Sequence, residues 1–127
     1  MYSIEEINEL LDEVAAGIPD EVFRELNGGV SLLPETKLSE SDPDGCLYTL
    51  GEYHRDQMGR YIVLYYGSIC AVHGDDSRSR MRQNLKKVLT HELTHHLESL
   101  AGDRDLEVQD EIDLENYFQG KDRGDRR

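Results

Sequence analysis

The sequence predicts a single α+β domain. Helical periodicity marks both ends of the chain, and the middle carries short runs rich in β-branched and aromatic residues between turn-forming residues. The predicted order is two helices, a short and mostly antiparallel sheet, and two further helices. A chain of 127 residues suits one domain with a modest core. We expect this domain to span residues 1–118, with a charged, flexible tail at 119–127.

The first helix is predicted over residues 3–16. Ser3 is a suitable N-cap, Glu6 stands three residues later as in a capping box, and Gly17 ends the helix. Because a helix repeats every 3.6 residues, apolar side chains at this spacing form one face that faces the core. The predicted face consists of Ile4, Ile7, Leu10, Leu11 and Val14.

The middle of the chain is predicted to form a hairpin. Its two candidate strands are separated by residues 55–59, in which Gly59 can adopt the positive φ of a turn. The elements expected from residue 18 onward are a short helix at 18–29, a strand at 30–34, a polar loop at 35–45, and hairpin strands at 46–54 and 60–69.

The C-terminal part is predicted to be helical. A long helix begins after a cap among residues 75–77, runs to about Leu100 and ends at Gly102. A final helix is expected at 105–118.

Composition narrows the class of protein. Lys and Arg number 14 against 27 Asp and Glu, so the formal net charge is −13. Nucleic acids and anionic membranes both favour basic partners, so neither is expected to bind. The apolar runs are too short to span a bilayer and no signal-peptide pattern is visible, which predicts a cytoplasmic location. Cys46 and Cys70 are expected to lie near each other across the hairpin as reduced, packed thiols.

The long helix contains the motif H-E-x-x-H at His91, Glu92 and His95. Residues i and i+4 lie on the same helix face, so the two imidazoles can bind one ion. Glu92 is rotated by about 100° from His91, where its carboxylate can accept a proton from a zinc-bound water. The alternative is an amphipathic helix with incidental histidines.

A helical wheel places the two motif histidines at the rim of the apolar face, where a cleft is expected. It places His96 in the middle of that face, as a buried histidine rather than a ligand. The residues of the apolar face are Met81, Leu85, Leu89, Leu93, Leu97 and Leu100.

With "THELTHH", "LGEY" and "YIVLYYGSI", the chain resembles the small bacterial zincin-like metallopeptidases, described as Asp-zincin-like minimal zincins. The resemblance implies a minimal zincin-like fold, in which a short sheet packs on the motif helix, and one zinc ion. It implies a peptide or protein substrate, received as an extra strand on the sheet edge beside that helix. Tyr53, Tyr65 and Tyr66 are candidate donors to an oxyanion, although each also suits plain strand packing.

The third zinc ligand is the open question. The family pattern H-E-x-x-H-x-x-G-x-x-D has Gly and Asp where this chain has Glu98 and Ala101. A later G-x-x-D, four residues farther on, makes Asp105 the first choice for the ligand on this resemblance. Other candidates are Asp103, Glu98, and, on the final predicted helix, Glu107, Asp110 or Glu111.

The expected function is a zinc-dependent peptidase, with His91, His95 and Asp105 binding zinc and Glu92 acting as the general base. Because Gly is missing at position 98, a catalytically inactive zincin-like domain that binds metal or a protein is the alternative. A latent enzyme with a covered cleft is a third. The basic run from Arg78 to Lys87 is expected mainly to pair with the surplus carboxylates. The oligomeric state is not predicted.

Overall fold

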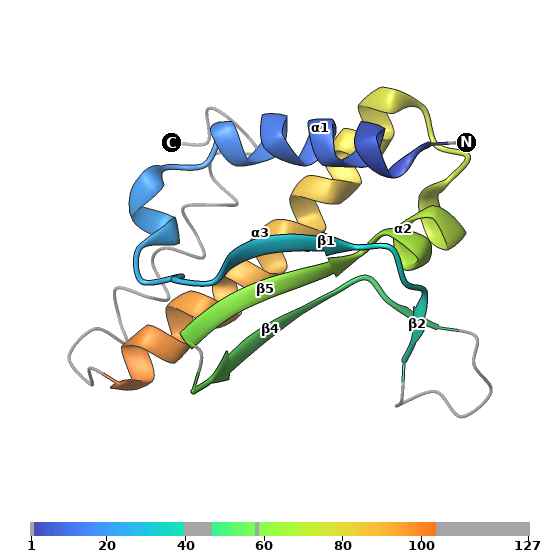
Figure 1. Cartoon of the computed structure of the whole chain (residues 1–127). Coiled ribbons are helices and arrows are strands. Elements are labelled where there is room, and N and C mark those ends of the chain that lie inside the picture. Colours follow the sequence, from blue (N-terminus) through green and yellow to red (C-terminus); the bar gives the residue numbers. More distant parts are fainter. Residues whose placement is uncertain (1, 40–46, 58, 104–127) are drawn as a thin grey trace.

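The structure, a computed structural model, describes residues 2–39, 47–57 and 59–103 (Figure 1). These residues form the predicted α+β fold. The elements are α1 (Ile4–Ala16), the 3₁₀ turn η1 (Asp20–Phe23), β1 (Gly29–Leu33), β2 (Lys37–Leu38), β3 (Tyr48–Thr49), β4 (Gly51–Asp56), β5 (Gly59–Tyr65), α2 (Tyr66–His73) and α3 (Arg78–Asp103).

Helix α1 forms as predicted. The Ser3 side chain accepts a hydrogen bond from the Glu6 amide, and the Glu6 carboxylate accepts one from the Ser3 amide, which completes the capping box. The helix buries one face: Ile7, Leu10, Leu11 and Val14.

The second predicted helix is reduced to a single 3₁₀ turn at η1, where Val22 is buried. Glu25, with φ of 66°, lies in the left-handed region, which an α-helix cannot accommodate. The chain therefore turns directly into β1.

The main sheet has the strand order β1-β5-β4. The predicted hairpin is confirmed: β4 and β5 are antiparallel, with Glu52 opposite Val63, and Gly59 has a φ of 113°. The strand predicted at 46–54 is divided, however, between β3 and β4. Strand β1 joins the other edge of β5 in parallel, a pairing that the sequence pattern did not indicate. β4 consequently forms one edge of this sheet within the described residues.

Two further segments differ from prediction. Part of the predicted loop at 35–45 forms β2, which pairs with β3 in a small second sheet. The end of the predicted strand at 60–69 instead begins helix α2. Ser68, fully buried in α2, accepts a hydrogen bond from the Lys37 amide and donates one to the Lys37 carbonyl, so a tertiary contact joins the two segments.

Helix α3 begins after Ser77, whose side chain accepts from the Arg80 amide, as predicted. It continues through Gly102 instead of ending there. Figure 1 shows α3 crossing behind the main sheet, with α1 along the β1 side. The predicted apolar face is confirmed as the core, since Met81, Leu85, Leu89, Leu93, Leu97 and Leu100 are all buried.

Several predictions fall outside the described residues: Cys46, the helix at 105–118 and the tail at 119–127. Cys70 lies on α2. None of the helices in the described ranges has the length and apolar character needed to cross a bilayer.

Candidate metal centre

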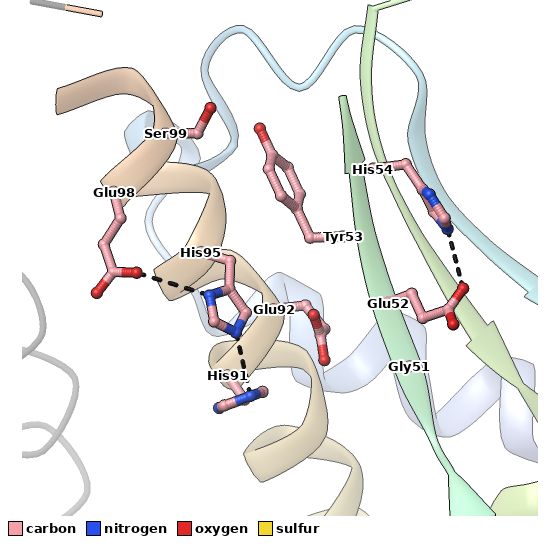
Figure 2. A pocket seen from close by; sticks show the side chains of 9 residues that line it. All are labelled: Gly51, Glu52, Tyr53, His54, His91, Glu92, His95, Glu98 and Ser99. Atoms are coloured by element: carbon pink, nitrogen blue, oxygen red, sulfur yellow. Dashed lines mark hydrogen bonds and ion pairs between the residues drawn. The ribbon is translucent and has the colours of Figure 1, made fainter. Parts of the chain in front are cut away.

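Helix α3 presents the two motif histidines together at its surface (Figure 2). His91 and His95 are both exposed, and their Nε2 atoms lie 3.2 Å apart. The rings meet edge to face, with centroids 4.7 Å apart and an interplanar angle of 84°. The predicted convergence of the two imidazoles is thus observed.

Both histidines line a cavity of about 800 Å³ between α3 and the edge strand β4. The α3 wall is His91, Glu92, His95, Glu98 and Ser99, and the β4 wall is Gly51, Glu52, Tyr53 and His54 (Figure 2). The cleft expected at the rim of the apolar face is therefore present.

The spacing of the histidine nitrogens fits a shared zinc ion. Two ligands at the usual Zn–N distance of about 2.0–2.1 Å, separated by a tetrahedral angle, lie about 3.3 Å apart. The observed 3.2 Å agrees, although one neutral imidazole donating to the other gives the same distance. Within the described residues no group of three potential ligands converges.

A third zinc ligand would therefore have to come from the other candidates named from the sequence. Asp105 and the alternatives Glu107, Asp110 and Glu111 lie outside the described residues. Asp103 ends α3, and its side chain is also outside the described part.

Glu98 faces the histidine pair, as the wheel predicted, but from the far side of the ring. Its carboxylate lies 3.6 Å from Nδ1 of His95, whereas Nε2 of His95 faces His91 (Figure 2). A carboxylate at this position favours the tautomer with hydrogen on Nδ1, which leaves Nε2 free to bind a metal. This geometry suits Glu98 to orient the His95 ring rather than to bind the same metal ion as His95.

Glu92 differs from the two motif histidines because its side chain is buried, with only 7% exposed. Burial raises the pKa of its carboxyl group, while positive charge on His91 and His95 lowers it. Figure 2 shows the carboxylate extending from α3 into the gap toward β4. A carboxylate with a raised pKa at a cavity wall is suited to accept and return a proton.

Comparison with solved structures establishes the family. A conserved hypothetical protein from Thermus thermophilus matches with a TM-score of 0.67 and 32% sequence identity. The match covers 80% of this chain and 99% of that protein. The chain belongs to the same family as that protein. No sequence-family profile and no curated protein matches. The structural match therefore establishes the fold and the family, but it does not indicate an activity.

His96 is fully buried, as predicted, and both ring nitrogens have partners. Nε2 lies 2.8 Å from the Arg24 carbonyl, which only accepts, so Nε2 carries the hydrogen. Burial lowers the pKa of His96, so the ring is neutral and its Nδ1 accepts from the Tyr53 hydroxyl at 3.0 Å. The Tyr53 hydrogen is therefore directed at His96, and the phenol oxygen offers lone pairs rather than an oxyanion donor.

The other two tyrosine candidates lie away from the cavity lining. The Tyr65 hydroxyl donates to Glu52, and the Tyr66 hydroxyl donates to the Tyr2 carbonyl. Of the three tyrosines proposed from the sequence, Tyr53 lines the cavity.

The sequence interpretation missed Glu52 and His54, which both line the cavity from β4. Glu52 accepts hydrogen bonds from Lys37, Tyr65 and His54. Partial burial alone would raise the pKa of Glu52, but these hydrogen bonds together outweigh it and lower the pKa. Glu52 and His54 share the face of β4 opposite to Tyr53, and Figure 2 shows both side chains on the side of the strand away from α3. Strand periodicity alone therefore did not predict that they reach this cavity.

Proposed function

We propose that the protein is a zincin-like, zinc-dependent peptidase in which His91 and His95 bind the metal and Glu92 is the general base. The observation that supports it most is the convergence of two exposed histidine nitrogens, 3.2 Å apart, beside a buried glutamate on a cavity wall. A structural imidazole pair does not require a neighbouring glutamate or a cavity.

Each motif residue then has a chemical task. Zinc, when bound, supplies the Lewis acidity that lowers the pKa of water to about 7 and polarises a peptide carbonyl. Glu92 accepts the proton of the attacking water and returns it to the leaving amine, so its protonation state is restored after each turnover. Glu98, whose carboxylate lies 3.6 Å from Nδ1 of His95, favours the tautomer that leaves Nε2 free.

Strand β4 is suited to bind the substrate. It pairs with β5 on one side, and its other edge is unpaired by strands within the described residues. Because the motif residues and β4 line one cavity, a peptide added to this edge as a further strand would pass beside His91 and His95.

The third ligand is expected from the segment after α3. With a rise of about 1.5 Å per residue, Asp103 lies roughly 12 Å beyond His95 along the helix axis. The two residues to Asp105 span at most about 7 Å, so Asp105 reaches the histidines only if the last turn of α3 opens. Glu107, Asp110 and Glu111 follow with enough chain to fold back. Separate alanine substitutions at these positions and at Asp105, compared by zinc affinity, identify the ligand.

The deciding experiment is metal analysis of protein purified without chelators, together with Glu92→Gln. We expect one zinc per chain, retained in the variant, while peptide cleavage falls by about 10²–10⁴-fold because the general base is removed. Absence of zinc after purification and after added zinc would refute the proposal. Glu5→Gln, an exposed change on α1, is the matched control and should leave cleavage unchanged.

The inactive zincin-like domain is the second candidate. It is favoured by the uninterrupted course of α3 through Glu98 and Ala101, where the family pattern breaks the helix and supplies a ligand. A zinc-loaded protein that cleaves no member of a broad peptide library would support this alternative.

A further inference from the structure

A second cavity, of about 460 Å³, extends the first one along α3. Gly51, His91 and Glu92 line both cavities, and in Figure 2 they lie toward the lower end of the view. The second cavity continues from them toward the start of α3, where Leu50 and Val88 contribute apolar surface. A substrate that passes the motif would place a neighbouring side chain in this space.

Lys87 supplies positive charge to the wall of the second cavity. It precedes His91 by four residues, one helical turn, and so lies on the same face of α3. Arg78 and Arg82 on the same helix pair with Glu13, as expected for this basic run. Lys87 is exposed and has no ion-pair partner within the described residues, so its ammonium group is available to a ligand.

His73 provides a second polar group on this wall. Its Nδ1 lies 3.1 Å from the Asp76 carboxylate and 3.1 Å from the Asn84 amide nitrogen, which donates to the same carboxylate at 2.8 Å. With the hydrogen on Nδ1 and directed at Asp76, Nε2 of His73 only accepts, so it can meet a donor group of a ligand but not a carboxylate.

We infer that the second cavity is a specificity site for a carboxylate-bearing substrate residue, next to the peptide bond that is cut. Leu50 and Val88 would contact the methylene groups, and Lys87 would pair with the carboxylate, of a glutamate or aspartate side chain or of a free C-terminus. Glu92, the acidic residue of the lining, lies at the end shared with the first cavity. The identity of the ligand as part of a peptide rests on the proposed function.

The first test measures binding without catalysis. Acetyl-Ala-Glu-Ala-amide and acetyl-Ala-Gln-Ala-amide are titrated into the protein, and amide shifts of Leu50, Gly51 and Val88 are followed by NMR. We expect the Glu peptide to bind about two- to fivefold more tightly, the range of an exposed ion pair, and Lys87→Gln to remove the difference. Acetyl-Ala-Ala, with a free C-terminus, tests the terminal carboxylate as the source.

Arg80→Gln is the matched control, because it removes one charge from the same helix at a residue outside the lining of the second cavity. It should leave the preference intact, and Lys87→Arg should retain it. Equal affinities for the Glu and Gln peptides, or a preference that survives Lys87→Gln, would overturn the inference.

The second test is the cleavage profile of the zinc-loaded protein on a peptide library. We expect acidic residues to be enriched at one position beside the cut, and Lys87→Glu to shift that position toward basic residues. Cleavage without this preference would reject the specificity site and leave the peptidase proposal standing. No cleavage, with charge-dependent NMR binding retained, would reject the peptidase proposal and leave the carboxylate site.

Discussion

Helix α3 carries two kinds of histidine within one and a half turns, and they differ in nearly every physical respect. His96 is fully buried, and both ring nitrogens bind partners from other elements, Tyr53 of β4 and the Arg24 carbonyl after η1. His91 and His95 are exposed at a cavity, and their Nε2 atoms face each other.

This difference indicates that His96 contributes to stability, whereas His91 and His95 are available for ligand binding. A buried polar group costs free energy unless it is hydrogen-bonded, so the satisfied His96 joins three parts of the fold. An exposed imidazole gains little from folding, which leaves its nitrogens free to bind a ligand. The motif histidines and the neighbouring His96 are thus expected to respond differently to substitution: the first through metal affinity, the second through stability.

The largest effect is expected from His96→Ala. The substitution opens a cavity and leaves the Tyr53 hydroxyl and the Arg24 carbonyl without their partner. The free energy of unfolding should fall by about 3 kcal/mol or more, measured by urea denaturation at pH 7. His96→Phe, which restores a ring but not the hydrogen bonds, should recover only part of the loss. Unchanged stability in both variants would show that the network contributes nothing.

A smaller effect, of the opposite kind, is expected from His91→Ala. Because the side chain is exposed, the free energy of unfolding without metal should change by no more than about 0.5 kcal/mol. Zinc affinity should fall by more than about 100-fold, beyond the loss seen when only an outer-shell partner is removed. Competition with a chromophoric chelator measures it. His54→Ala removes an imidazole from the opposite wall and serves as control; an equal loss there would contradict the assignment.

The smallest effect concerns Glu52 and His54, which lie between the two extremes in burial. Hydrogen bonds lower the folded-state pKa of Glu52 below its ordinary 4.5, so its contribution to stability is present above that pH and is lost as the pH falls through the folded value. We expect Glu52→Gln to cost about 1 kcal/mol at pH 7, with the difference from the native protein shrinking below about pH 4.5. Denaturation between pH 3 and 7 measures this, and a pH-independent difference would contradict it.

Patterns of local origin were predictable. The capping box of α1, the apolar face of α3, the hairpin and the facing of His91, His95 and His96 all follow from helical or strand periodicity, which neighbouring residues set by themselves. The η1 turn, α2 and the β2–β3 pair were missed, because short apolar or polar runs suit several conformations and distant contacts, such as Ser68 with Lys37, select among them.

The sequence by itself determined the α+β class, the H-E-x-x-H motif and the division of the histidines between core and surface, because spacing along a helix assigns each side chain to a face. Only the tertiary structure decided what stands opposite that face: β4 with Glu52 and His54, Tyr53 turned toward His96, and Lys87 beside the second cavity. The reason is that periodicity describes one element at a time, whereas a cavity is formed by elements far apart in the chain.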